Sequence, residues 1–287
     1  MSAEKLSIQL EQIVRKRIQE DSLVLPTLPA VATRINEILK DPEVNLRRAA
    51  EVVEQDPVLA ARALRAGGVT GPGPGKKATV PDALARMGPR AVRTLLADAA
   101  GLKLFVSRDA KIAGAARKLW EHSVAVGSMA RDVSALSGYP DSAGAYLAGL
   151  LHDLGKYVVM TVLLELERQM TELYNQPWIQ FDEWIEVVGR THRGVGVALA
   201  ERWQLPEAIA KCIRESSEYD NSDRSALVNA VCFGNALAKK SATYSGPIDH
   251  DDVDALLMIG RSLIGVSDDV LKSLTLGLRE RVEGLFD

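Results

Sequence analysis

Apolar residues recur along most of this chain at intervals of three and four positions, the spacing that places them on one face of an α-helix. The clearest run, in the segment LPTLPAVATRINEILKD, consists of Leu28, Val31, Ile35, Ile38 and Leu39. The alternation of apolar and polar residues that marks a half-buried strand is essentially absent. The pattern therefore predicts an all-α fold.

Residues that favour helix starts stand where these periodic runs begin. Asn45 precedes LRRAAEVVEQ, and Asp56 precedes Pro57 and the run VLAARALRA, so both side chains can accept hydrogen bonds from the first turn of a helix. Asp141 or Ser142 can cap, in the same way, a helix that contains AYLAGLLHDLGKYVVM. We expect three short helices in the first quarter of the chain, followed by longer ones.

The segment from Gly67 to Lys77, GGVTGPGPGKK, interrupts the helical pattern. Alternating glycine and proline support neither a helix nor a strand, so this segment is predicted to be a loop. It does not fit a phosphate-binding loop, because Gly75-Lys76 is followed by Lys77 instead of serine or threonine and no strand precedes it. The pattern assigns no function to this loop.

The composition is that of an ordinary soluble protein without a strong electrostatic bias. Of the 287 residues 47% are hydrophobic and 25% are charged, and the formal net charge is −3. No general attraction to nucleic acid or to anionic membranes follows from that charge. The two cysteines, Cys212 and Cys232, have no paired spacing and are predicted to be small core residues.

The chain shows no pattern that directs it to a membrane. Its first residues lack the basic head, apolar run and cleavage site of a signal peptide. The most apolar short run, from Tyr157 to Leu164, is too short to span a bilayer. We therefore expect a cytoplasmic protein.

Candidate chemistry centres on the adjacent pair His152 and Asp153 in the segment AGLLHDLGK. Imidazole and carboxylate are both ligands of divalent transition metals. On an ideal helix neighbouring side chains point about 100° apart, so the two can converge on one ion only where the helix edge faces a pocket. His122 lies on another predicted helix, 30 residues earlier.

The segment AGLLHDLGK resembles the defining motif of the HD superfamily, whose phosphohydrolases bind divalent metals through a histidine, a His-Asp pair and a later aspartate. By this resemblance His122, His152 and Asp153 are metal ligands, and Lys156 is placed to contact a phosphate. The later aspartate is replaced by Asn235, whose neutral amide leaves the ion one negative charge short. The resemblance therefore implies a degenerate hydrolytic site.

Further motifs resemble one branch of this superfamily, the HD-related output domain (HDOD) proteins. The leucine- and proline-rich segment from Leu25 onward and the later segment THRGVGVALAERWQLPEAI match the beginning and the end of that domain in the same order. Ser216 and Ser217 stand where related HD proteins often carry two histidines, and hydroxyls are weaker ligands than imidazole. The resemblance covers about residues 23–220 and implies a bacterial signalling module.

The same resemblance divides the chain into three predicted parts. Residues 1–22 are an N-terminal helical extension, and residues 23–220 are the HDOD-like domain. Within that domain an N-terminal lobe covers about residues 23–105, and an HD-like lobe covers about residues 106–220. Residues 221–287 are C-terminal helices that complete the HD-like core.

Each candidate ligand also has a structural interpretation. His122, His152 and Asp153 can form a buried cluster that is satisfied by its own hydrogen bonds, and with one carboxylate missing we favour this over stable metal binding. Lys156 can be a surface lysine after a helix-ending glycine. His192, in THRGVG, can serve helix packing or hydrogen bonding, and it is also a candidate for lining a pocket.

Two functions correspond to these alternatives. The favoured one is a non-enzymatic regulatory module that transmits a signal by binding a protein partner or a small ligand such as a regulatory nucleotide, without a cofactor. The alternative is a phosphohydrolase or phosphodiesterase that acts on a nucleotide and depends on a divalent metal. The sequence identifies neither the partner, nor the pathway, nor the ligand.

Overall fold

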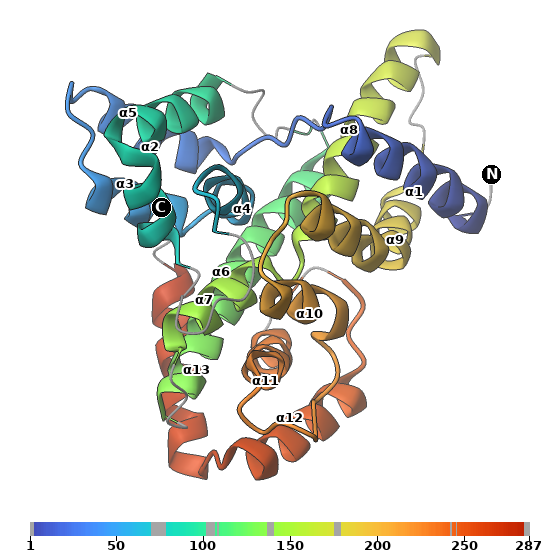
Figure 1. Ribbon diagram of the computed structural model, residues 1–287. Coiled ribbons are helices and arrows are strands. Elements are labelled where there is room, and N and C mark those ends of the chain that lie inside the picture. The colour runs from blue at the N-terminus through green and yellow to red at the C-terminus, as the bar shows by residue number, and fades with distance from the viewer. Residues whose placement is uncertain are drawn as a thin grey trace.

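The computed structural model describes residues 3–69, 79–101, 107, 109–136, 141–174, 179–241, 243–244 and 246–283. Within them the chain forms thirteen α-helices and no β-strand (Figure 1), which confirms the predicted all-α fold. Most of the Gly67–Lys77 loop, from residue 70 onward, lies outside the described residues.

Four helices form the N-terminal lobe. They are α2 (Pro29–Leu39), α3 (Leu46–Val53), α4 (Pro57–Ala66) and α5 (Val80–Gly101). Helix α5 packs against each of the other three. It kinks at Gly88, which has a φ of 74° and is followed by Pro89. As predicted, Asn45 caps α3 by accepting two backbone hydrogen bonds, and Asp56 caps α4 by accepting one from Leu59.

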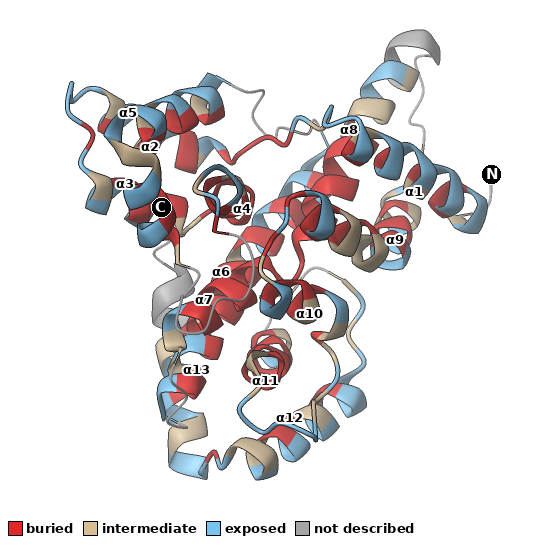
Figure 2. Cartoon of the chain, viewed as in Figure 1, coloured by how far each residue is buried: buried red, intermediate tan, exposed pale blue. Residues whose placement is uncertain are grey.

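The second group contains the helices from α6 to the end of the described chain. Its members are α6 (Ala110–Leu136), α7 (Ser142–Leu151), α8 (Leu154–Tyr174), α9 (Phe181–Arg202), α10 (Glu207–Glu215), α11 (Leu227–Lys240), α12 (His250–Ile264) and α13 (Asp268–Glu283). Helix α6 packs along both α7 and α11, and α8 packs along α9. Every residue from Val228 to Ala238 on α11 is buried, and Figure 2 shows buried residues concentrated on α6, α7 and α11. The centre of the core lies between these helices.

Both ends of the described chain pack against this group. Helix α1 (Ala3–Gln19) lies along α9 and buries Leu6, Leu10, Val14 and Ile18. At the other end α12 packs on α11, and α13 packs on α6. Residues from all parts of the chain belong to one continuous hydrophobic core. The domain boundaries given above stay predictions.

Helices α8 and α9 approach each other closely at two glycines. A Cβ atom added to Gly155 would lie 1.8 Å from the backbone oxygen of His192, and one added to Gly196 would lie 3.2 Å from the backbone nitrogen of Gly155. Only glycine fits at Gly155 without moving the backbone of α9. This contact holds His192 beside the segment that carries the His-Asp pair.

One long apolar stretch of the described chain lies inside the fold. By length and composition Ser142–Met170, which includes α7 and most of α8, could cross a membrane. Its most apolar window is 100% buried, as it is in the core helices of soluble proteins. The run Tyr157–Leu164 is part of this stretch. The stretch Ser142–Met170 is therefore weak evidence for a membrane span.

Candidate metal and ligand site

The His-Asp pair lies where two helices meet. Helix α7 ends at Leu151 and α8 begins at Leu154, so His152 and Asp153 occupy a junction, which corrects the prediction of one continuous helix. The chain turns here, and the backbone amide of Lys156 donates to the carbonyl of Asp153 at 2.8 Å. Because the junction is not an ideal helix, the two side chains are free of the offset of about 100° and can face the same neighbours.

The structure brings together the three predicted metal ligands. A nitrogen of His122, a nitrogen of His152 and an oxygen of Asp153 all lie within 4.8 Å of one another. From Asp153 Oδ2, the Nε2 atom of His152 is 3.3 Å away and the Nε2 atom of His122 is 3.8 Å away. All three residues are buried. Helix α6 supplies one member of this cluster, and the junction of α7 and α8 supplies the other two.

Both histidines of the cluster present ring nitrogens that lack partners among the described residues. Nδ1 of His152 donates to the carbonyl oxygen of Gly149 at 2.7 Å, which leaves Nε2 to face the cluster. That Nε2 atom approaches Asp153 without hydrogen-bond geometry, and neither ring nitrogen of His122 has a partner. Buried polar atoms without partners are rare, and a histidine held by a backbone carbonyl is a typical metal ligand.

Lys156 is buried and does not behave as a surface lysine. Its ammonium lies 2.6 Å from Asp153 Oδ2. The same ammonium donates to the hydroxyl of Tyr244 at 3.2 Å and lies 4.5 Å from the centre of the Tyr244 ring. It therefore places a positive charge directly against the one carboxylate of the cluster.

These contacts shift the ionisation of the cluster in different directions. Burial alone would raise the pKa of Asp153, but His152 and Lys156 together lower it by more, so the pKa of Asp153 is held well below its usual range. Burial lowers the pKa of His122 well below its usual value, and His152 adds to this effect. Burial also lowers the pKa of Lys156, but Asp153 and Tyr244 outweigh it and the pKa is raised. Near neutral pH the cluster holds an ionised Asp153, a charged Lys156 and a neutral His122.

Asn235, at the position where the resemblance predicts the missing aspartate, is buried on α11. Its amide nitrogen donates to the carbonyl of Ser216 at 3.1 Å, and its amide oxygen has no partner in the described part of the chain. The hydroxyl of Ser217 accepts a hydrogen bond from Arg193 at 2.6 Å. These three residues contribute no negative charge, so Asp153 stands alone in that role.

His192 lies at the edge of the cluster. Its Nδ1 atom is 3.1 Å from the carbonyl oxygen of Val188 and 2.8 Å from that of Gly189, so the lone pair is on Nε2. Nε2 lies 3.9 Å from Asp153 Oδ1. Burial lowers the pKa of His192 to about 4, helped by the charge of Lys156, and the ring is neutral at neutral pH. His192 thus combines backbone hydrogen bonds with a place beside the cluster.

Tyr244 is a site residue that the sequence reasoning missed. It follows the end of α11, and its ring meets the ring of His122 edge-on with centroids 5.1 Å apart. The ammonium groups of Lys156 and Lys239 approach the same ring at 4.5 Å and 5.2 Å. No local motif signals this role, because Tyr244 is 88 residues from Lys156 in the sequence.

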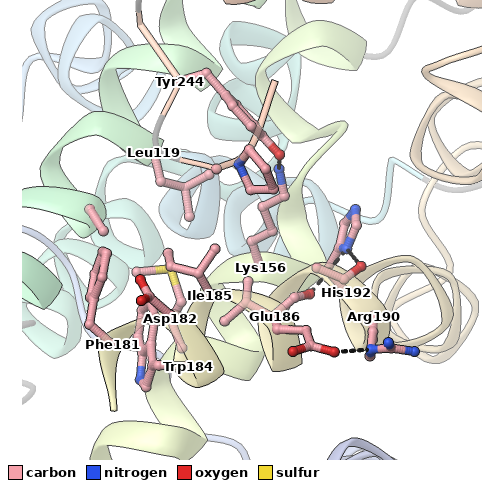
Figure 3. A pocket seen from close by; sticks show the side chains of 16 residues that line it. Leu119, Lys156, Phe181, Asp182, Trp184, Ile185, Glu186, Arg190, His192 and Tyr244 are labelled. Carbon is pink, nitrogen blue, oxygen red and sulfur yellow. Dashed lines mark hydrogen bonds and ion pairs between the residues drawn. The ribbon is translucent and has the colours of Figure 1, made fainter. Parts of the chain in front are cut away.

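A cavity of about 750 Å³ adjoins the cluster (Figure 3). It is bounded by α6, α8, α9 and the segment around Tyr244, and Lys156 and His192 line it as well. The other walls are mostly apolar and include Leu119, Met160, Phe181, Trp184, Ile185 and Val188. Sites for small molecules commonly have volumes of about 300–1,000 Å³, so this cavity can hold one.

The cluster fits one divalent ion in the type and spacing of its donors. Two imidazole nitrogens and a carboxylate oxygen, all closely spaced, are ligands that Zn²⁺ or Mn²⁺ accepts. The charge balance opposes such an ion, because Lys156 already neutralises Asp153. An added divalent ion would leave two positive charges buried, and its binding would require an anion that binds with it.

The arrangement of helices is also found in solved structures. The MmoQ response regulator of Methylococcus capsulatus str. Bath is similar with a TM-score of 0.62, over 88% of this chain and 98% of that one, at 18% sequence identity. A protein of Shewanella amazonensis SB2B, provisionally named a metal-dependent phosphohydrolase, gives a TM-score of 0.54 over 98% and 99% of the two chains, also at 18% identity. At these identities the likeness establishes the fold alone.

Sequence comparison adds a relative and a family. The chain is 27% identical over 218 residues to an uncharacterized protein of Treponema pallidum (strain Nichols). The match covers 74% of this chain and 41% of that protein, so the chain spans about two fifths of its relative's length. The model of the HDOD domain family matches residues 25–219, a range that contains the His-Asp pair but neither Asn235 nor Tyr244.

Proposed function

This chain belongs to the HDOD domain family, and from that premise we propose that it is a non-enzymatic regulatory module that transmits a signal by binding a protein partner or a small ligand. A signalling role is supported by the family and by the likeness of the fold to a response regulator. In this proposal the cluster of His122, His152 and Asp153 ties helices together beside a binding cavity. It is not a catalytic centre.

The observation that carries the proposal is the buried ion pair of Lys156 and Asp153, with 2.6 Å between Nζ and Oδ2. A hydrolytic metal centre needs carboxylates free to balance the ion and to hold a water beside it. Here the carboxylate is engaged by an ammonium, and Asn235 is neutral. Binding and rate acceleration require different groups, so the cavity can keep a ligand without a hydrolytic step.

A cytoplasmic location in a bacterial cell is part of the proposal. Cys212 and Cys232 are both buried free thiols, which suits a reducing compartment. The net charge of −3 gives no reason to expect nucleic acid as the partner. A protein partner therefore remains the principal expectation, with a small ligand in the cavity as the input.

A second candidate function is a phosphohydrolase that depends on a divalent metal. The observation that favours it is the set of ring nitrogens on His122 and His152 that have no partner among the described residues. Those two side chains and Asp153 would hold the ion, which when bound would polarise a phosphoryl oxygen. Lys156 would then donate a hydrogen bond to the phosphate, as the resemblance to the HD superfamily implies.

Hydrolysis assays separate the two candidates. Protein purified without chelators is incubated with p-nitrophenyl phosphate and bis-p-nitrophenyl phosphate in the presence of Mg²⁺, Mn²⁺ or Zn²⁺, and its rates are compared with those of His152→Ala. We expect equal rates at background level. Metal-dependent turnover that disappears in His152→Ala, or one tightly held metal per chain by elemental analysis, would establish the second candidate instead.

Deletion and complementation in the host test the signalling role itself. We expect deletion of the gene to change a regulated output, and the His152→Ala variant to restore it, because the output depends on binding and not on the ring nitrogens. Deletion without any change, or failure of a folded His152→Ala variant to restore the output, would contradict the proposed function.

A further inference from the structure

The cavity beside the cluster has walls suited to a flat, apolar body. Phe181 and Trp184 at the start of α9 have nearly parallel rings, with 12° between their planes and 6.5 Å between their centroids. Met160, Ile185 and Val188 continue the apolar lining toward Lys156. Figure 3 shows Tyr244 at one side of this space and the Phe181–Trp184 pair at the other. Apolar ring systems gain most from burial against such walls.

Two hydrogen-bond donors of the lining have capacity left for a ligand. The Lys156 ammonium donates to Asp153 and to Tyr244, which leaves one of its three N–H groups. Trp184 is 1% exposed, and its indole nitrogen has no acceptor among the described residues. A buried donor without an acceptor is costly, so a ligand that brings an acceptor to the Lys156 ammonium is favoured.

The charges around the cavity are arranged asymmetrically. The Lys156 ammonium belongs to a buried residue, whereas the carboxylates of Asp182 and Glu186 belong to exposed residues at the rim. Arg190 pairs with Glu186 at 2.8 Å, which leaves Asp182 to make the rim negative. Asp153 is not among the described residues that line the cavity, so a ligand meets the ammonium without meeting the carboxylate behind it. An anionic group is attracted to the inner end and repelled from the rim.

We propose that this cavity binds a flat, largely apolar molecule with a single anionic end, of the class of aromatic carboxylates and sulfonates. The anionic end contacts the ammonium of Lys156 and the hydroxyl of Tyr244. The ring system lies against Ile185 and the Phe181–Trp184 pair. This inference rests on the proposed function, because it specifies the small ligand to which the module responds.

A nucleotide matches the cavity less well than an aromatic monoanion. Its ribose hydroxyls would be buried against apolar walls between Lys156 and Trp184, where the described side chains offer few acceptors. Its phosphate also carries more negative charge than one ammonium balances. The exposed carboxylate of Asp182 would repel that charge at the entrance.

Two fluorescent probes with the same ring system test the proposal. 8-Anilinonaphthalene-1-sulfonate carries the anionic end, and N-phenyl-1-naphthylamine is the same body without it. We expect the folded full chain to bind one molecule of the sulfonate and to bind the uncharged probe at least about 10-fold more weakly, since a hydrogen bond to a charged group is worth about one to two factors of ten in affinity.

Substitutions on opposite walls of the cavity separate the two contributions. Lys156→Met should weaken the sulfonate by about 10- to 100-fold and change the uncharged probe little. Ile185→Trp should weaken binding of both probes, because the larger side chain occupies the wall against which the ring system lies. Since Lys156→Met leaves Asp153 without its partner, Lys156→Met/Asp153→Asn repeats the measurement without a buried net charge.

Three results would overturn the proposal. They are equal binding of the two probes to the unmodified chain, undiminished sulfonate binding in Ile185→Trp, and displacement of the sulfonate by AMP at lower concentration than by 1-naphthoate. The third would assign the cavity to nucleotides. None of them touches the hydrolysis assay or the deletion phenotype, so failure here is distinguishable from failure of the proposed function.

Discussion

Replacing Lys156 by methionine perturbs the charge balance of the buried cluster in the most direct way. Lys156→Met keeps the length and the apolar part of the side chain but removes the ammonium that lies 2.6 Å from Asp153 Oδ2. Asp153 is only 4% exposed, so water cannot replace that ammonium. The variant leaves an uncompensated carboxylate inside the fold.

The size of the effect follows from the geometry of the pair. At an effective dielectric constant of about 20, Coulomb's law gives a gross attraction of about 6 kcal/mol for this separation. Desolvation offsets part of it, and removal of one partner from a buried pair costs about 3–5 kcal/mol. We therefore expect a loss of about 3 kcal/mol in the free energy of unfolding.

A double-mutant cycle measured by urea unfolding isolates this contribution. The free energies of unfolding of the unmodified chain, Lys156→Met, Asp153→Asn and the double variant are compared at neutral pH. We expect each single variant to lose about 3 kcal/mol or more. The double variant should lie within about 1–2 kcal/mol of the unmodified chain, because a buried pair can often be replaced as a unit at little cost.

The exposed pair of Lys240 and Asp254 supplies a matched control within the same chain. Their side chains are 55% and 61% exposed, and the same cycle on Lys240→Met and Asp254→Asn should give a coupling energy below about 1 kcal/mol. A coupling energy for Lys156 and Asp153 as small as that of the control would refute the reasoning. It would mean that the carboxylate does not depend on the ammonium.

Four further outcomes are expected. Asp56→Ala should lose about 2–4 kcal/mol, because it removes the cap of α4 and the acceptor of buried hydrogen bonds. Burial raises the pKa of Asp56 above 3.8, so ionisation of Asp56 lowers the stability of the folded chain as the pH rises through that pKa. Between about pH 4 and 7 the urea midpoint should therefore fall less for Asp56→Asn than for the unmodified chain. Parallel pH profiles of the two proteins would contradict this. Gly155→Ala should prevent stable folding. A Cβ atom at Gly189 meets nothing within 4 Å, so Gly189→Ala should keep or slightly raise the thermal midpoint measured by calorimetry. Equal midpoints for the two variants would exclude the close approach of α8 and α9. Burial raises the pKa of Cys212 and of Cys232 to about 12, so a disulfide reagent should titrate them only in urea, and fast labelling of the folded chain would show that they are accessible.

The helices and their starts could be read from the sequence because their causes are local. The caps Asn45, Asp56 and Asp141 act within three residues of their own position, so residue type and spacing suffice to find them. Apolar periodicity likewise reports one face of one helix. The break between α7 and α8 escaped this reasoning, because His152 and Asp153 interrupt the apolar pattern for only two residues and no proline marks the junction.

The cluster was predictable only in part, for a physical reason. His122, His152 and Asp153 carry a motif with fixed residue types, and the structure places them together. Lys156 was known as a candidate, but its burial depends on which elements cover it. Tyr244 covers it from a segment 88 residues away, and such contacts leave no local pattern. The aromatic wall of the cavity was missed for the same reason, since Phe181 and Trp184 fit an ordinary amphipathic helix equally well.

Lys156 connects the cluster, the cavity and the segment around Tyr244, because its one ammonium serves all three. It neutralises Asp153 at 2.6 Å, donates to Tyr244 at 3.2 Å and lines the cavity. A ligand anion that accepts from the remaining N–H group of this ammonium also meets the hydroxyl of Tyr244, whose ring contacts that of His122. The Asp153 contact is the tighter of the two, at 2.6 Å against 3.2 Å for Tyr244. Ligand binding would therefore act first on the position of Tyr244, which lies between α11 and α12, and this would give the proposed binding module a route from its cavity to its surface.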